Sequence, residues 1–182
     1  MMKYTKTLIL KDGRQALIRN GVAADGPAVY DNIIETHLET DYMLSYPDES
    51  TFNGEKEAKL LEDKTASDKE VELVAFVDGK VAGSAGISSI GDKYKIKHRA
   101  DFGISLLKEY WGLGLGSALM EACIECARKA GYLQIELEAV AENDRALALY
   151  KKMGFVEFGR NPRGFNSRAS GYQELVYMRL EL

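Results

Sequence analysis

The sequence predicts a single domain of the mixed α/β (α+β) class, and three patterns carry this prediction. Apolar and polar side chains alternate in 71–77, before an Asp78-Gly79 turn and a returning apolar segment, which is the pattern of a β-hairpin. Apolar residues then recur at helical spacing in 117–130 and alternate again in 133–139. The chain of 182 residues contains no linker or internal repeat, so we expect one domain over residues 1–182.

The start of the chain is predicted to form two short strands and a helix. The apolar segments 8–10 and 16–19 flank Asp12-Gly13, a dipeptide typical of tight turns. Pro27, with Asp25 before it as a cap, begins a helix in which apolar residues recur at helical spacing. An acidic and aromatic loop over 39–50 and a second helix from Asn53 to about Lys64 are expected to follow.

The remainder of the chain alternates strands with two further helices. By residue number, the predicted strands after the first hairpin strand are 81–89, 100–107, 133–139, 155–159 and 174–180. Gly83 and Gly86 weaken the first of these and indicate a bulge. A helix over Ser117–Ala130 should end at Gly131, and the last helix should begin after Asn143 as N-cap and end at Gly154. Gly164 and Gly171 are assigned to loops.

The composition excludes several classes of protein. With 17 glycines but only 3 prolines, the chain is neither collagen-like nor a Pro-rich disordered protein. Its 24 basic and 28 acidic residues give a net charge of −4, which lacks the basic surface of a nucleic-acid-binding protein. No apolar run approaches the ~18 residues that span a bilayer, and the run at 8–10 is too short for a secretory signal. We expect a cytoplasmic protein that binds neither nucleic acid nor membrane.

Two cysteines form a Cys-x-x-Cys pair, for which a redox or metal site is conceivable. Cys123 and Cys126, however, lie in the middle of a predicted helix among apolar residues, and both histidines are far away in the sequence. We therefore expect reduced structural thiols and no metal site.

Three glycines, Gly112, Gly114 and Gly116, stand between a predicted strand and a predicted helix. A helix N-terminus presents unpaired N–H groups, and glycines let a phosphate approach that backbone, so 104–117 resembles a pyrophosphate cradle. A turn that serves packing alone is the alternative. The loop lacks the Lys of a Walker A motif and the Gly spacing of a dinucleotide fingerprint.

The sequence Trp111-Gly112-Leu113-Gly114-Leu115-Gly116 is similar to motif A of the GNAT N-acetyltransferase superfamily, Gln/Arg-x-x-Gly-x-Gly/Ala. The segment from Asn143 to Phe155 resembles the family pattern Asn-x-x-Ala-x-x-Leu-Tyr-x-x-x-Gly-Phe at the right distance. The detailed match covers Arg99 to Phe158, about a third of the chain, and resembles the bacterial ribosomal-protein alanine acetyltransferases most. Trp111 departs from the pattern, because the family has Gln or Arg there.

This resemblance implies a mostly antiparallel central sheet of about six to seven strands flanked by about four helices. It also implies that acetyl-CoA is the cosubstrate and that the strand ending at Leu106 carries a bulge that holds the pantetheine arm. The residues that would contact acetyl-CoA lie on that strand, in the glycine turn and before the last helix: Ile104, Ser105, Leu106, Trp111, Gly112, Leu113, Gly114, Leu115, Gly116, Ser117 and Asn143.

The resemblance further implies direct transfer of an acetyl group to an amine, with two catalytic side chains. Tyr150 matches the tyrosine that donates a proton to the leaving thiolate, although its helical spacing also fits a core residue. Glu138 matches the general base, although a solvated strand glutamate is the alternative. The N–H near Leu106 would stabilise the oxyanion. His98 is a weaker candidate base, and His37 is expected to be structural.

The acceptor is expected to be a primary amine, either a small molecule or a protein N-terminus, and the family allows a homodimer. We hypothesise that the acidic loop attracts this amine through residues among Asp41, Tyr42, Tyr46, Asp48 and Glu49, although an ordinary solvated loop is as consistent with the sequence. Two other functions stay open: a non-catalytic acyl-CoA-binding module and a nucleotide-binding protein of the Rossmann type.

Overall fold

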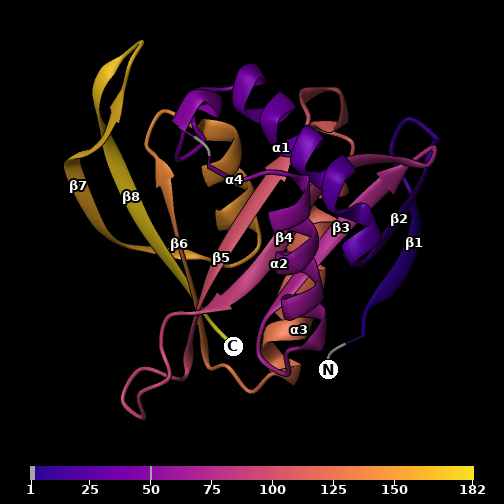
Figure 1. Cartoon of the computed structure of the whole chain (residues 1–182). Helices are drawn as coiled ribbons and strands as arrows, with labels where there is room; N and C mark the ends of the chain where they lie inside the picture. The colour runs from indigo at the N-terminus through magenta and orange to yellow at the C-terminus, as the bar shows by residue number, and fades with distance from the viewer. Residues whose placement is uncertain (1–2, 50) are drawn as a thin grey trace.

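The computed structural model describes residues 3–49 and 51–182, and within them one sheet of eight strands is flanked by four α-helices (Figure 1). The strands are β1 Thr5–Ile9, β2 Gln15–Asn20, β3 Val71–Val77, β4 Lys80–Ser89, β5 Arg99–Leu106, β6 Gln134–Val140, β7 Val156–Ser167 and β8 Gly171–Glu181. The helices are α1 Gly26–Glu39, α2 Gly54–Ala66, α3 Leu115–Lys129 and α4 Asp144–Lys152. The predicted mixed, mostly antiparallel class is confirmed.

The strand order is β1-β2-β3-β4-β5-β6-β8-β7, and every neighbouring pair is antiparallel except β5 with β6. That parallel pair is short, because only 99–101 of β5 faces 134–136 of β6. Beyond this point β5 stays with β4 up to Leu106, whereas β6 stays with β8 up to Val140. Figure 1 shows the two strands separating from their shared end, so the sheet opens at its centre.

The helices cover both faces of the sheet. The alternation of β3 places Leu73 and Ala75 in the large core with α3 and α4, and places Val74 on the opposite face with Val29 of α1 and Leu61 of α2. Cys123 and Cys126 are buried in the large core, as free thiols. Burial raises the pKa of Cys126 to about 11, so this thiol stays protonated at neutral pH.

Three details of the strands differ from the expectation. The sheet has eight strands in place of six or seven, and the last two are longer than predicted. Gly164 lies within β7 and Gly171 begins β8, so neither belongs to a loop. The pairing of β7 with β8 shifts register between Asn161 and Phe165, and this irregularity breaks the alternation by which a strand is recognised in a sequence.

The expected bulge in the strand that returns from the hairpin is confirmed. Ala75 pairs with Gly83 and Phe76 pairs with Val81, which leaves Ala82 as the extra residue of β4. None of the helices in the described part of the chain combines the length and the apolar character that spanning a bilayer requires.

Candidate active site

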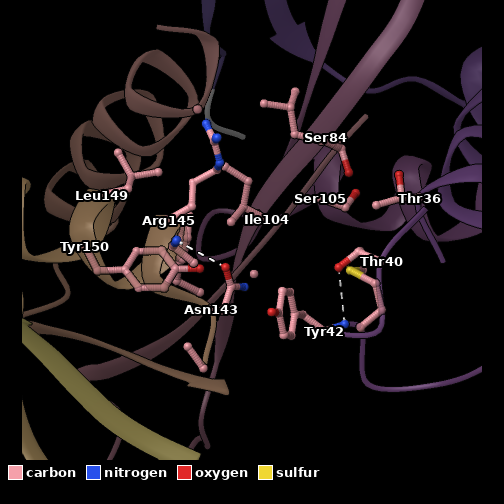
Figure 2. A pocket seen from close by; sticks show the side chains of 18 of the residues that line it. Thr36, Thr40, Tyr42, Ser84, Ile104, Ser105, Asn143, Arg145, Leu149 and Tyr150 are labelled. Carbon is pink, nitrogen blue, oxygen red and sulfur yellow. Dashed lines mark hydrogen bonds between the residues drawn. The ribbon is translucent and has the colours of Figure 1, made fainter. Parts of the chain in front are cut away.

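A cleft of about 730 Å³ lies where β5 and β6 separate (Figure 2). The cleft is walled by β5, by the turn before α3, by α4 and by the segment that follows α1. Both catalytic candidates line it, and so do nine of the eleven residues predicted to contact acetyl-CoA: Ile104, Ser105, Leu106, Trp111, Gly112, Gly114, Gly116, Ser117 and Asn143. Sequence positions up to 46 residues apart, from 104 to 150, therefore meet around one cavity.

The glycine turn forms one end of the cleft. Gly112 and Gly114 have φ of 76° and 95°, a left-handed conformation that side chains rarely adopt, so the turn requires glycine at both positions. A Cβ on Gly114 would have no heavy atom within 4 Å, so the space beside the turn is open. The N–H groups of the first turn of α3 lack partners within the helix. This end can therefore bind an anion through the backbone.

Four cationic residues line the same cleft, Lys11, Lys64, Arg145 and Lys152, and Lys64 is paired with Glu72. The guanidinium of Arg145 lies 5.1 Å from the centre of the Trp111 ring, and its Nη1 lies near Gly112. The residues present therefore fit a diphosphate, because backbone donors and cations converge on one end.

Trp111, which departs from the family motif, has a structural role. Its Nε1 donates a hydrogen bond to the carbonyl oxygen of Leu106 at 2.7 Å, which ties the glycine turn to the end of β5. Leu113 and Leu115, also predicted to contact acetyl-CoA, are not among the residues that line the cleft. Leu115 is fully buried in the core, and the carbonyl of Leu113 accepts a hydrogen bond from Lys11 N at 3.1 Å. Only the backbone of these two leucines is available for a contact with a bound phosphate.

The end of β5 presents its backbone to the cleft. Leu107 N donates to Ala82 O at 3.1 Å, so 107 and 82 form a hydrogen-bonded pair of the antiparallel ladder. Because bonded and non-bonded pairs alternate, the N–H groups of Leu106 and Ile104 point away from β4 and toward the gap that β6 leaves. The expected bulge at Leu106 is absent from the β4–β5 register, which runs without a shift. The separation of β6 from β5, and not a bulge, leaves the N–H groups of Ile104 and Leu106 without a neighbouring strand to pair with.

Tyr150 lies on α4 between two aromatic rings. Its ring meets Phe102 edge-on at 6.5 Å and Phe155 at 6.1 Å, which fixes its orientation. Figure 2 shows its hydroxyl pointing into the cleft on the side of Asn143. Burial raises the pKa of Tyr150 to about 12, so the phenol stays protonated at neutral pH. The ring of Tyr150 therefore belongs to the core, while the same residue also lines the cleft.

Asn143 lies opposite Tyr150 at the start of α4. Its Oδ1 accepts a hydrogen bond from Ala146 N at 3.3 Å, so the residue caps the helix as predicted. The side chain also lines the cleft, and the cap leaves its amide N–H₂ group available for a bound molecule.

Glu138 lies on β6 and faces the cleft, where it makes no hydrogen bond or ion pair with the described residues. Its neighbour Glu136 is engaged, since Arg99 Nη2 donates to Glu136 Oε2 at 2.7 Å. The two glutamates of this strand therefore differ: one is held in an ion pair outside the cleft, and the other is free to accept a proton inside it.

Another carboxylate that the sequence did not predict, Asp101 of β5, also lines the cleft. Burial in the cleft, and then the negative charges of Glu138 and Glu136, raise the pKa of Asp101. The alternation of β5 could have revealed it, because Asp101 shares a face with Ser105, which was predicted. Asp101 and Glu138 thus line the cleft without an ion-pair partner among the described residues, whereas the third lining carboxylate, Glu72, is paired with Lys64.

The structure corrects the hypothesis that the acidic loop attracts the amine, because the carboxylates of this loop are engaged within the protein. Arg168 pairs with Asp48, Nη1 to Oδ1 at 2.8 Å, and with Glu49, Nη2 to Oε1 at 3.5 Å. Ser167 donates a hydrogen bond to Asp41. These contacts tie the loop to the β7–β8 hairpin, so the three carboxylates do not stand free to attract an amine.

The loop still shapes the cleft through its apolar and aromatic side chains. Tyr42, Met43 and Leu44 line the cavity, and Tyr42 Oη lies 3.4 Å from Glu142 O. Figure 2 shows the Tyr42 ring beside Asn143. Tyr46 does not line this cleft, and its hydroxyl donates to Asp41 at 2.9 Å.

His98 is not placed to act as a base in this cleft. It precedes β5, does not line the cavity, and its carbonyl accepts a hydrogen bond from Leu133 N at 2.9 Å. His37 of α1 also lies outside the cleft, with Nδ1 2.6 Å from Ile33 O.

Comparison with known proteins shows the family to which this sequence and this site belong. Residues 33–155, more than half of the chain, match the sequence profile of the acetyltransferase (GNAT) family. The chain belongs to this family. The matched range contains the glycine turn, Glu138 and Tyr150; it begins inside α1, and β1, β2, β7 and β8 lie outside it.

Two curated relatives of this GNAT protein come from Escherichia coli. It is 34% identical over 108 residues to an L-amino acid N-acetyltransferase, which covers 59% of this chain and 65% of that protein. It is 33% identical over 81 residues to a ribosomal protein bS18-alanine N-acetyltransferase, which covers 44% of this chain and 54% of that protein. The matched segment thus spans less than two thirds of either relative.

Solved structures match the GNAT fold over most of the chain. An acetyltransferase of the GNAT family from Streptococcus pneumoniae is 30% identical with a TM-score of 0.87, covering 92% of this chain and 99% of that chain. A phosphinothricin acetyltransferase from Sinorhizobium meliloti, solved with acetyl-CoA, has a TM-score of 0.80 at 21% identity, covering 92% of this chain and 88% of that chain. At 21% identity the second likeness shows the fold alone.

Proposed function

We propose that this chain is an acetyl-CoA-dependent N-acetyltransferase that transfers the acetyl group directly to a primary amine. Acetyl-CoA would supply the activated thioester. The observation that supports the proposal is one cleft that combines a glycine turn at a helix N-terminus, strand N–H groups along β5 and the unpaired carboxylates of Asp101 and Glu138. The acceptor would be a small-molecule amine or a protein N-terminus, the two kinds that the curated relatives' names describe.

The cosubstrate would lie along β5, with its diphosphate at the glycine turn. The N–H groups of Gly114, Gly116 and Ser117 would donate to the phosphate oxygens, and Arg145 would neutralise part of their charge. The N–H groups of Ile104 and Leu106 would then pair with the pantetheine arm and the thioester carbonyl, because they already point into the gap.

The reaction places three demands on the protein side chains. An alkylammonium with a pKa of ~10.4 must lose a proton before its nitrogen attacks, and Glu138 with Asp101, which line the cleft, would accept it. The carbonyl oxygen gains negative charge, which the N–H of Leu106 would stabilise. The sulfur of the leaving group gains negative charge, and the protonated Tyr150 hydroxyl would donate a hydrogen bond to it.

Replacing Tyr150 by Phe is expected to lower kcat by ~10- to 100-fold while acetyl-CoA affinity is unchanged. The variant keeps the ring between Phe102 and Phe155 and removes only the hydroxyl. Steady-state kinetics and calorimetric titration with acetyl-CoA measure the two quantities. Tyr177→Phe, a ring that packs on Phe158 of β7, is the control and should keep the full rate. Wild-type turnover in Tyr150→Phe would remove the donor role.

The decisive experiment is an acceptor screen in which CoA release is measured with a thiol reagent. We expect thiol release that depends on both acetyl-CoA and an amine from a panel of amino acids, polyamines, aminoglycosides and N-terminal peptides. Thermal shift should show stabilisation by acetyl-CoA and none by NAD or ATP. Binding of acetyl-CoA without thiol release from any amine would favour a non-catalytic acyl-CoA-binding module. Stabilisation by NAD alone would favour a nucleotide-binding protein.

The remaining expectations stay part of this proposal. The chain would act as one domain over residues 1–182, in the cytoplasm, without nucleic acid or membrane as a partner, and a homodimer is compatible with it. Sedimentation of the purified protein, with and without acetyl-CoA, tests the assembly.

A further inference from the structure

A second cavity, of about 350 Å³, lies between α1, α2 and the segment that joins them. Its lining includes aromatic rings and one carboxylate: Tyr30, Ile33, His37, Tyr46, Phe52 and Glu57. Among all its lining residues only Ile33 also borders the acetyl-transfer cleft, so the two cavities are distinct. Nothing in the proposed reaction uses this second cavity.

Glu57 is the residue of this cavity that indicates a cationic ligand. Its side chain is buried, with the residue only 4% exposed, and its carboxylate makes no hydrogen bond or ion pair within the described ranges. The nearest cation is engaged elsewhere, since Lys64 Nζ donates to Glu72 Oε2 at 2.8 Å. A buried carboxylate without a partner is strongly unfavourable when charged, and burial and the charge of Glu72 raise the pKa of Glu57 to about 7. A positive charge in the adjacent cavity would remove this penalty.

The aromatic walls are held in place by contacts outside the cavity. The hydroxyl of Tyr46 donates to Asp41 at 2.9 Å and accepts from Arg168 N at 2.8 Å. The His37 ring is held at both nitrogens, with Nδ1 2.6 Å from Ile33 O and Nε2 3.3 Å from Ser45 Oγ. A cavity with several rings and one carboxylate suits an organic cation, because ring faces attract alkylated ammonium groups.

We infer that this cavity binds a small alkylated ammonium ion, with Glu57 as its counter-ion and Tyr30 and Phe52 as its aromatic walls, since the Tyr46 ring is already covered by the guanidinium of Arg168 at 4.2 Å. A divalent metal ion would require several oxygen or nitrogen ligands, and no group of three such acidic, His or Cys side chains suited to a metal occurs in the part of the chain that the structure describes. The site is independent of acetyl transfer, so it is tested by binding and not by turnover.

The test uses choline as the probe and 3,3-dimethylbutan-1-ol, its neutral isostere, as the matched control. The chain has two histidines, and only His37 lines the cavity, so the ring signals of His37 report binding in an NMR titration while those of His98 serve as reference. We expect choline to shift the His37 signals in a saturable manner and the isostere to shift neither histidine. Equal shifts with both compounds would show an apolar cavity only and would overturn the inference.

Two variants assign the effect to this site. Glu57→Gln keeps the side-chain shape and should weaken choline binding by at least about tenfold, as should Phe52→Ala at the rim. Glu55→Gln, on the exposed side of the same helical turn, should bind choline as the wild type does. Asp101→Asn should also retain binding, which excludes the acetyl-transfer cleft as its place. Undiminished binding in Glu57→Gln and Phe52→Ala, or no shift of His37 in the wild type, would refute the site.

Discussion

Glu138→Gln is expected to lower kcat/KM for the amine by about 10²- to 10³-fold and to leave acetyl-CoA affinity unchanged. The carboxylate faces the cleft without a partner, so its basic oxygens are available to the acceptor ammonium. Glutamine has the same shape but cannot accept the proton at neutral pH. Initial rates over a range of amine concentrations, with acetyl-CoA saturating, measure the loss.

Asp101 makes the loss partial and gives it a signature in the pH profile. The negative charge of Glu138 is one cause that raises the pKa of Asp101, so removing this charge lowers that pKa. The residual activity of Glu138→Gln should therefore keep an acidic limb that reports Asp101, at a pH below the pKa that Asp101 has beside the charged Glu138 in the wild type. The double variant Glu138→Gln with Asp101→Asn should lose the limb and most of the remaining rate.

Glu136→Gln is the matched control, because it removes a charge from the same strand and the same face. Its carboxylate pairs with Arg99 outside the cleft, so the expected effect is on thermal stability and not on kcat/KM. If Glu136→Gln lost as much kcat/KM as Glu138→Gln, the role of Glu138 would reduce to the overall charge of the strand. An unchanged pH profile in Glu138→Gln would remove Glu138 as the base.

The sequence predicted the local elements that have strong periodic patterns or clear end signals. Asn143 and Gly154 mark the ends of α4, and the turn at Gly114 marks the start of α3, because backbone conformation restricts the residue types allowed there. The family motifs predicted Tyr150 and Glu138 in one site, and both line the same cleft. The cap residues, the glycine turn and the family motifs all consist of residues that lie close together in the chain.

The parts that the sequence missed depend on contacts between distant segments. Asp101 faces Glu138 only because β5 and β6 are parallel neighbours that separate, and nothing in the segment around Asp101 indicates that pairing. The carboxylate of Asp48 is engaged by Arg168, 120 positions later, so the loop looked free in the sequence although it is not. Local patterns do not report which charges are neutralised across the fold.

The anion-binding end of the cleft can be tested by a substitution that separates folding from cofactor binding. Ser117 is the third residue of α3, and the first turn of this helix contains no acidic residue. A glutamate there favours the helix, because it accepts the partial positive charge of the N-terminus and contributes about 0.3–1 kcal/mol. Ser117→Glu should therefore unfold at the same temperature as the wild type or at a higher one.

The same charge should oppose the cosubstrate. Two like charges ~4 Å apart at a protein surface repel by about 4 kcal/mol, so acetyl-CoA affinity should fall by at least about 100-fold in Ser117→Glu. Ser117→Gln, which adds the same volume without charge, is the control and should lose much less. Calorimetric titration measures both, and the difference between them should shrink as salt is added, since ions screen an exposed charge.

These two variants distinguish charge from size and locate the phosphates. Equal losses in Ser117→Glu and Ser117→Gln would mean that the added side chain blocks the cleft sterically, whatever its charge. Unchanged affinity in both would place the diphosphate away from the glycine turn and would contradict the proposed orientation of acetyl-CoA. A stable Ser117→Glu protein with weak binding that salt partly restores is the result that backbone recognition at α3 requires, because only an anion at the helix N-terminus competes with that carboxylate for the same donors.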